Sequence, residues 1–315
     1  AFSVIMDKHA GNFDTAELPF SYISVENGKS VLTPAMNLFT VGTARDNKKW
    51  PSRDRRKDPK KLDQIHFDFL NPFTAGKMMD GVNLLNRLHE NTPKSREFAS
   101  YNGIHINRLM LRTSKRYYEL ALMVFITGKL VDLLKNSSFN TIAEIQKILS
   151  PAREAKLKKW VDLAGLLTEK ERIDTFYDAI VSQRVNTIEG IQNEFQKIHG
   201  EYEHKAWQWC LALLKKWKNT DISDLKKEEL LRLLDDWKNS SVKFNNMILK
   251  DAEKEFDQLS RIGFGPDGDD NQKQADFKNI RGDYESNKFI AGIREKTKEI
   301  EKNYDELLSQ LNSIE

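Results

Sequence analysis

Short apolar stretches alternate with polar ones over the first 43 residues, and this pattern predicts extended backbone. Pro, Gly and Asn separate four stretches rich in β-branched and aromatic residues, FSVIM, FSYISV, KSVLT and NLFTVGT. Asn27-Gly28 predicts a tight hairpin between the second and third stretches, because both residues tolerate positive φ. Strands this short form only a weak core by themselves, so we expect them to belong to a larger sheet.

From residue 71 onward, apolar residues recur at helical spacing. Asn71-Pro72 predicts a helix start, since Asn can cap free N–H groups and Pro suits the first turn; that helix ends near Thr92-Pro93. A long helix is predicted from about Gly103 to Lys135. Further helix starts are predicted at Ser150-Pro151 and at Thr168, which has Glu three residues later as in a capping box.

The last 130 or so residues continue this helical pattern. A helical segment is predicted over 187–218, and a following amphipathic stripe consists of Leu230, Leu234, Trp237, Phe244 and Ile248. The loop GFGPDGDD, 263–270, precedes a final helix over 275–313, bent near Gly282. Segments this long without a breaker are typical of long antiparallel helices in a bundle or coiled coil.

The predicted fold class is therefore mainly α, with long antiparallel helices preceded by a small β segment. We expect a short β segment at 1–45, which would be the end of a larger β domain, a basic linker at 46–70 and a helical domain at 71–315. The chain begins with Ala, and FSVIM is typical of a strand inside a sheet, so we expect the chain to be cut from a longer protein.

Charge is unevenly distributed along the chain. The net charge of +3 is close to neutral for 315 residues and gives no global nucleic-acid signature, so no nucleic-acid partner is predicted. However, nine Lys or Arg and three Asp lie between Arg45 and Lys61, which makes that stretch +6 and the remainder −3. The basic stretch is therefore a candidate site for an anionic ligand.

Nothing in the sequence predicts export or membrane insertion. Cys210 is the only cysteine, so no internal disulfide marks an oxidising compartment. No apolar run is long enough to span a membrane, and the first residues lack the features of a signal peptide. We therefore expect a cytoplasmic location and no membrane partner.

Several apparent motifs have simpler explanations. Glu201 and His204 have the spacing of a di-iron ligand pair, but a second such pair is missing, so no metal site is predicted. Cys210 lies in an apolar stretch and is better explained as a buried core residue than as a nucleophile. Core packing likewise explains the tryptophans at 207, 209, 217 and 237 better than a stacking platform does. The sequence leaves the cofactor unknown.

Two stretches near the N-terminus remain as candidate sites. His9 lies beside Asp7 and Asp14 in a turn-rich segment, where it could act as a general base, although a polar loop held by its own Asx turns is the simpler interpretation. In ARDNKKWPSRDRRK, arginines and lysines surround a Trp. Arg forks suit phosphates and Trp can stack on a base or sugar ring, whereas salt bridges with Asp46 and Asp54 are the alternative. The candidate binding residues are Arg45, Lys49, Trp50, Arg53 and Arg55.

Four stretches resemble an uncharacterised bacterial family: DKHAGNFDTAELPFSYI, NLFTVGTARDNKKWPSRDRR, NPFTAGKMMDG and INRLMLRTSKRYYELAL. In that family, a left-handed parallel β-helix of the hexapeptide-repeat transferase type precedes a long helical C-terminal region. The resemblance covers most of residues 1–135. It implies that this chain is the C-terminal part of such a protein, with the last strands of the β-helix, although no regular six-residue repeat is visible here.

The resemblance also implies a function for the parent protein. Enzymes with this β-helix often transfer acyl or nucleotidyl groups to activated sugars and often use a loop histidine as base, and His9 is the histidine in such a context. The expected ligand is then a nucleotide sugar or sugar phosphate. The helices would serve assembly or docking, with a homo-oligomer as one outcome. The alternative is a non-catalytic helical interaction module, and the sequence leaves open whether this chain is itself an enzyme.

Overall fold

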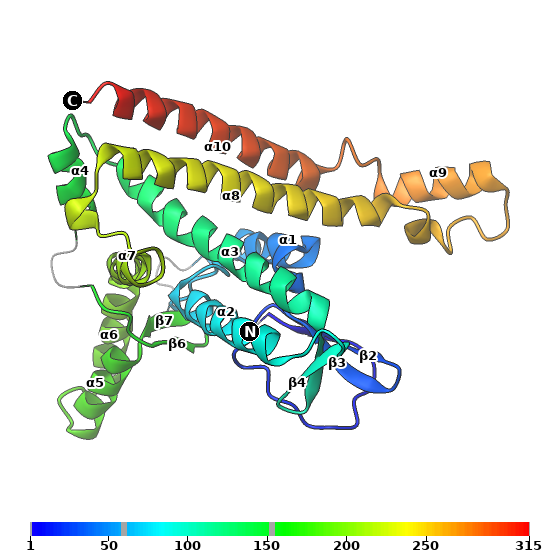
Figure 1. The fold of residues 1–315 in the computed structure, drawn as a ribbon, viewed down its shortest axis with the longest axis horizontal. Coiled ribbons are helices and arrows are strands. Elements are labelled where there is room, and N and C mark those ends of the chain that lie inside the picture. The colour runs from blue at the N-terminus through cyan, green and yellow to red at the C-terminus, as the bar shows by residue number, and fades with distance from the viewer. Residues whose placement is uncertain (1, 58–61, 151–154, 315) are drawn as a thin grey trace.

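The computed structural model describes residues 2–57, 62–150 and 155–314, and it is mainly helical with two small sheets (Figure 1). The α-helices are α1 (Val41–Arg53), α2 (Pro72–Asn91), α3 (Arg108–Lys135), α4 (Ile142–Leu149), α5 (Lys170–Val181), α6 (Ile188–Gly200), α7 (Tyr202–Leu213), α8 (Lys227–Glu253), α9 (Asp270–Arg281) and α10 (Lys288–Asn312). A π turn, Leu214–Lys218, extends α7, and short 3₁₀ turns lie at Met36–Phe39, Ile222–Asp224, Lys254–Phe256 and Leu259–Arg261.

Among the described residues, five short strands form one mixed sheet in the order β1-β2-β3-β5-β4. They are β1 (Val4–Ile5), β2 (Tyr22–Glu26), β3 (Lys29–Thr33), β4 (Phe98–Tyr101) and β5 (Ile104–Asn107). β2–β3 and β4–β5 are antiparallel hairpins, while β3 pairs in parallel with β5. The larger sheet that the first strands need is thus completed by residues 98–107, and the described residues contain no coil of a β-helix.

The structure confirms the hairpin predicted at Asn27-Gly28 and adds two others. Asn102-Gly103 and Ala164-Gly165 also have positive φ and join pairs of four-residue strands, each followed directly by a helix. The prediction of a helix from Gly103 was therefore wrong for 103–107, which are turn and strand. A side chain at Gly103 would place its Cβ 2.5 Å from the backbone oxygen of Asn12, so the turn demands glycine.

The second added hairpin corrects another predicted helix start. Strand β6 (Trp160–Leu163) pairs with β7 (Leu166–Glu169), so Thr168 lies in a strand and α5 begins at Lys170 without a side-chain cap. The capping-box spacing was misleading here because the threonine side chain is buried in the hairpin. The helix start predicted at Ser150-Pro151 falls on residues 151–154, which lie outside the described residues.

The extended backbone predicted for NLFTVGT is also wrong. Residues Met36–Phe39 form a 3₁₀ turn, and the side chain of Thr40 accepts a hydrogen bond from the Thr43 N–H at the start of α1. Asp251 of α8 accepts a second one, 3.0 Å from the Val41 nitrogen. Two side-chain acceptors thus satisfy free N–H groups of α1 and outweigh the strand propensity of the apolar residues.

α1 continues into the stretch predicted as a basic linker, 46–70. Residues up to Arg53 are helical, and residues 58–61 lie outside the described residues. α2 starts at Pro72 with Asn71 as its cap, as predicted, and Thr74 adds a reciprocal capping box. The division into three domains stays a prediction.

The long helices α3, α8 and α10 form the upper layer of the molecule (Figure 1). α3 crosses α8, whereas α8 and α10 run antiparallel side by side, with α9 projecting beyond them. The stripe predicted on α8 is buried throughout: Leu230, Leu234, Trp237, Phe244 and Ile248. The single final helix predicted over 275–313 with a bend near Gly282 is instead two helices, because that glycine ends α9 at positive φ and α10 begins only at Lys288.

One contiguous cluster of buried apolar residues joins the sheet to the last helix. It includes Phe20 and Leu32 of the sheet region, Met78 of α2, Leu122 of α3 and Leu307 of α10. Tyr118 of α3 is fully buried, and its hydroxyl donates a 2.6 Å hydrogen bond to the Pro19 carbonyl. The N-terminal strands and the C-terminal helices therefore share a core.

Candidate functional site

A cavity of about 440 Å³ lies where five distant segments of the chain meet. Its walls come from α1, the residues before α2, the C-terminal half of α3, the middle of α8 and the first half of α10. A concave site with an apolar floor and a few polar groups is the usual form of a small-molecule site. We therefore treat this central cavity as the candidate functional site.

The floor of the central cavity is aromatic and aliphatic. The α8 stripe supplies Trp237, Phe244 and Ile248, and α10 supplies Ile293 and Ile300 across from it. Phe69 and Phe125 complete the floor. Phe244 packs against Phe39 with ring centroids 4.9 Å apart, so the aromatic groups are held in place by the core beneath them. Rings in this position can contact the apolar face of a sugar or a base.

Charged groups of both signs line the rest of the central cavity. The cations are Lys48, Lys129, Lys135 and Lys296, and the anions are Asp68, Asp132 and Glu299. Part of the Lys296 side chain is exposed to solvent. The surrounding protein nevertheless displaces water from its ammonium group, and this loss of water lowers the pKa of Lys296. The positive charge of Lys48 lowers that pKa further. Partial loss of water around its carboxyl group likewise raises the pKa of Asp132, although the residue as a whole is exposed. Perturbed lysine and carboxyl groups in one cavity are typical of functional sites.

Side-chain amides and a hydroxyl add hydrogen-bonding groups. Asn245 and Ser241 are buried in the wall formed by α8, and the Asn245 amide donates to Thr297 at 3.0 Å. The side-chain oxygen of Asn47 is fully shielded from solvent and has no hydrogen-bond partner among the described residues. A buried acceptor without a partner costs free energy, and a hydroxyl donor of a ligand would relieve that cost.

A stack of rings lies behind Lys129. The ring of His66 lies between His199 and Tyr202, with centroid distances of 4.1 and 3.8 Å. The Lys129 ammonium lies 5.6 Å from the Tyr202 centroid and forms an ion pair with Glu203. Burial, together with the nearby His199 and Lys129, lowers the pKa of His66 to about 4. The imidazole is thus neutral near pH 7 and packs as an aromatic ring.

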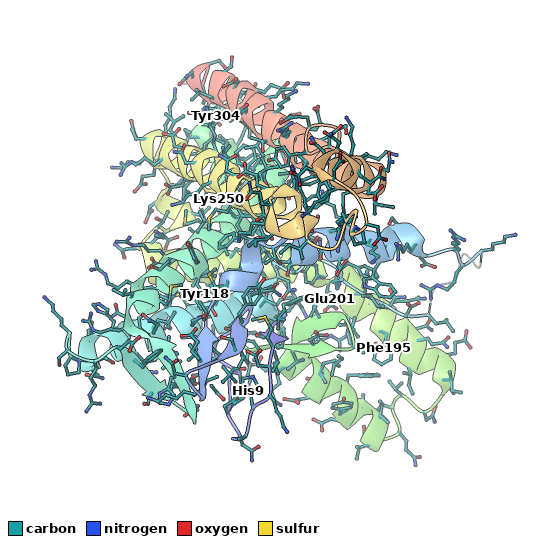
Figure 2. The ribbon with its side chains drawn as sticks, turned by 90° about the vertical axis from the view of Figure 1, so that its right-hand side faces the viewer. His9, Tyr118, Phe195, Glu201, Lys250 and Tyr304 are labelled. Atoms are coloured by element: carbon teal, nitrogen blue, oxygen red, sulfur yellow. The ribbon has the colours of Figure 1, made fainter. Side chains whose placement is uncertain are left out.

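His9, the predicted general base, lies on the N-terminal loop beside the sheet, on the far side of the molecule from Tyr304 of α10 (Figure 2). Its Nε2 donates to the Met6 carbonyl and its Nδ1 contacts the Ser30 hydroxyl, both at 2.8 Å. Asp7 and Asp14 accept hydrogen bonds from the Val25 and Ala16 N–H groups. The loop is therefore held by hydrogen bonds within itself and to β2 and β3, and His9 does not line the central cavity.

The predicted binding residues lie on or just after α1. Arg45, Lys49 and Arg53 share one helix face because they are four residues apart, and Asp46 lies 3.7 Å from both Arg45 and Lys49. Trp50 is 68% exposed, so its indole has no concave surroundings. Arg55 follows the helix. None of these five residues lines the central cavity, whereas their neighbours Asn47 and Lys48 do.

Sequence reasoning missed the residues of the central cavity. Lys129, Asp132 and Lys296 lie on helices, where isolated charges resemble an ordinary solvated face. Their common property in the sequence is a position within one helical turn of a buried apolar residue, such as Leu130 for Lys129 or Ile293 for Lys296. That signal is too common to identify a site without knowledge of helix packing.

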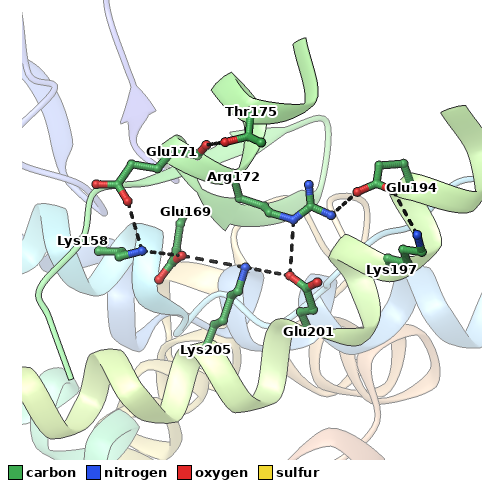
Figure 3. A network of polar contacts seen from close by, with 9 residues as sticks. All are labelled: Lys158, Glu169, Glu171, Arg172, Thr175, Glu194, Lys197, Glu201 and Lys205. Carbon is green, nitrogen blue, oxygen red and sulfur yellow. Dashed lines mark hydrogen bonds and ion pairs between the residues drawn. The ribbon is translucent and has the colours of Figure 1, made fainter. Parts of the chain in front are cut away.

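A network of ion pairs holds the β6–β7 hairpin and α5 against α6 and α7 (Figure 3). Lys158 bridges Glu169 and Glu171 at 3.2 and 3.0 Å, and Lys205 pairs with Glu201 at 2.7 Å. Glu201 also faces Arg172. Glu201 is thus engaged with cations, and no group of three or more His, Cys, Asp or Glu side chains in the described residues could hold a metal ion.

The buried aromatic and sulfur groups have structural roles, as predicted. Trp207 and Trp209 are buried and donate their indole N–H groups to the carbonyls of Leu149 and Lys158. Cys210 is fully buried, and burial raises the pKa of its thiol. Among the described helices, none is both long and apolar enough to cross a membrane.

Comparison with known proteins identifies two domain families. Residues 1–89 match the family described as Domain of unknown function (DUF4954), and residues 141–311 match the family described as Domain of unknown function (DUF6819). No curated protein and no solved structure matches the chain. Both descriptions fit the resemblance to an uncharacterised family. Because the second match spans more than half of its residues, this chain belongs to the DUF6819 family.

Proposed function

We propose that this chain binds a phosphorylated or nucleotide-activated sugar in its central cavity, as the C-terminal part of a transferase. The observation that carries this proposal is the convergence of four lysines on an aromatic floor. Lysine ammonium groups attract phosphate, and aromatic rings accept the apolar face of a sugar or base. The upstream β-helix and the transfer chemistry implied by the family resemblance are part of this proposal.

The polar groups of the central cavity favour a sugar over a purely apolar ligand. Asn47 offers a shielded acceptor without a partner, and Asn303, Ser241 and Glu299 also line the cavity. A volume of about 440 Å³ lies within the usual range for small-molecule sites, roughly 300–1,000 Å³. In the transferase, Lys296 would supply a cation for the phosphate, since the charge of a ligand phosphate would restore its protonated form.

Thermal-shift screening tests this proposal with nucleotide sugars, sugar phosphates and acyl-CoA. We expect sugar phosphates or nucleotide sugars to stabilise the protein, and the stabilisation to disappear in Lys296→Met, which keeps most of the apolar stem. Lys298→Met is the matched control, because Lys298 lies on the same helix with 75% of its side chain exposed. Equal shifts in both variants, or no shift in a protein that includes the upstream region, would count against the proposal.

The alternative function is assembly, and the projecting α9 region favours it. Leu259, Ile262 and Ile280 are each at least 70% exposed there, and α9 extends beyond the α8–α10 pair (Figure 1). Exposed apolar groups on a projection are suited to contact a second copy of the chain. Sedimentation across a range of concentrations should then show a dimer that Ile280→Asp dissociates. A concentration-independent monomer would argue against self-assembly.

A further inference from the structure

A second concave surface lies between α2 and the N-terminal half of α3. This cavity, the α2–α3 groove, has a volume of about 380 Å³ and is lined by Asn86, His89, Arg112, Lys115, Arg116 and Glu119. An adjoining cavity of about 420 Å³ shares Asn86, Lys115 and Glu119 and adds Arg87. The groove is therefore bordered by cations of α3, and Arg87 of α2 adds a cation in the adjoining cavity.

The helical repeat explains why these cations gather. Arg108, Arg112, Lys115 and Arg116 lie at positions i, i+4, i+7 and i+8 of α3, which places them along one face. Leu111 points inward from the same turns and is fully buried, as is Leu85 of α2. The apolar residues hold the two helices together, so the charged side chains border the groove above a rigid floor.

The charge of this region is strongly positive. Residues 87–116 contain seven Lys or Arg and two Glu. Glu90 accepts a hydrogen bond from the Asn86 amide at 2.7 Å, and Glu119 lies 3.7 Å from Lys115. Arg112 and Arg116 make no ion pair within the part of the chain that the structure describes. Two guanidinium groups in one groove therefore remain uncompensated.

The pKa of His89 responds to the positive charges around the groove. Loss of water around its ring lowers the pKa of His89, and the charges of Arg108 and Arg112 lower it further, against the opposing effect of Glu90. A neutral imidazole can still donate one hydrogen bond. An anion in the groove would restore favourable conditions for the imidazolium form.

We propose that the α2–α3 groove binds the phosphate group of a small molecule, at a site separate from the central cavity. Arg112 and Arg116 would contact the phosphate oxygens through their guanidinium forks, which suit phosphate in bidentate geometry. Lys115 adds a third cation, while His89 and Asn86 add hydrogen-bond donors. Glu119 lies at the edge that the adjoining cavity shares, and there it would orient Lys115.

The two sites lie toward opposite ends of α3. Lys115 borders the groove and Lys129 lines the central cavity, and at a rise of about 1.5 Å per residue they are separated by roughly 21 Å along the axis. One compact phosphate group is too small to span that distance. The groove is therefore a distinct site, and it does not depend on the function proposed for the cavity.

Isothermal titration calorimetry with pyrophosphate tests the groove. We expect pyrophosphate to bind the full chain at low salt, and the double variant Arg112→Gln, Arg116→Gln to weaken binding at least tenfold. Lys298→Gln, Lys302→Gln is the matched control, because both lysines are exposed on α10 and lie near glutamates. Lys296→Met should leave pyrophosphate binding at the groove unchanged, which separates this proposal from that for the central cavity.

Nitrogen NMR of the His89 ring gives a second readout that does not depend on heat. Pyrophosphate should raise the pKa of His89 in the wild-type protein and not in the double arginine variant. No detectable binding at millimolar pyrophosphate, or equal loss in the α10 control, would overturn the proposal. So would a single-stranded oligonucleotide that binds more tightly than pyrophosphate and depends on the same two arginines, since the groove would then serve nucleic acid.

Discussion

The neutral state of the His66 ring is the clearest case of a residue whose surroundings decide its chemistry. Its stacking between His199 and Tyr202 removes water, and Lys129 adds a positive charge nearby, so the pKa falls to about 4. In the unfolded chain an ordinary histidine has a pKa near 6.5. Between these two values the unfolded state binds the extra proton.

The stability of the protein should therefore fall as the pH drops from about 6.5 toward 4. Because protonation favours the unfolded chain in this window, we expect the free energy of unfolding to decrease by about 2 kcal/mol between pH 7.5 and pH 5 on account of His66 alone. Urea unfolding of wild-type and His66→Phe at both pH values isolates this contribution from that of the carboxylates. An equal decrease in the two proteins would show that His66 does not cause it.

The environment of a residue was predictable from the sequence where it depends on adjacent residues, and was not predictable where it depends on distant ones. Cys210 and Trp237 lie in apolar stretches, so their burial could be predicted directly. Lys296 and Asp132 carry no such mark, because the perturbation of each pKa comes from helices far away in sequence. The cavity groups could be identified only after α3, α8 and α10 had been placed together.

The boundaries of helices and strands were likewise predictable where adjacent residues determine them, and less so where distant residues contribute. Asn71-Pro72 and Asn27-Gly28 have strong local preferences, and the capped helix start and the hairpin formed where predicted. The start of α1 depends on a local and a distant acceptor, because Thr40 accepts from the Thr43 N–H and Asp251 accepts from the Val41 N–H from a position 210 residues later. The apolar residues of NLFTVGT favoured a strand, and the contribution of Asp251 could not be predicted from the sequence.

Removal of either acceptor should weaken the start of α1. We expect Thr40→Ala to lower the free energy of unfolding by about 1 kcal/mol, as for other N-cap losses. Asp251→Ala should cost about 1–2 kcal/mol, since a charged acceptor of the Val41 N–H is lost. Chemical denaturation measures both, and exposed Asp236→Ala on the same helix is the control. If Asp251→Ala matches that control, the long-range cap contributes nothing.

At the scale of the whole molecule, the shared core predicts how the protein unfolds. Leu32 of β3 and Leu307 of α10 belong to one buried cluster, although the sequence suggested a small β segment at 1–45 and a separate helical domain at 71–315. Loss of packing at either end should therefore lower the stability of the entire cluster.

Leu32→Ala in β3 and Leu307→Ala in α10 should each destabilise one common unfolding transition. Core truncations of this kind typically cost about 2–5 kcal/mol, because a cavity remains where the side chain was. Far-ultraviolet circular dichroism and tryptophan fluorescence should report the same shifted midpoint in each variant. Two separate transitions, each moved by only one of the substitutions, would instead support the division into independent domains.

Helix α3 carries Arg112 and Lys115 near its first turns and Lys129, Asp132 and Lys135 near its last. A continuous helix is stiff along its length, so a small slide or twist at one end moves the side chains at the other. If α3 can adopt two positions and a ligand at one end favours one of them, that ligand would change the affinity at the opposite end, and by reciprocity the reverse would hold. The two proposed sites would then be coupled through α3.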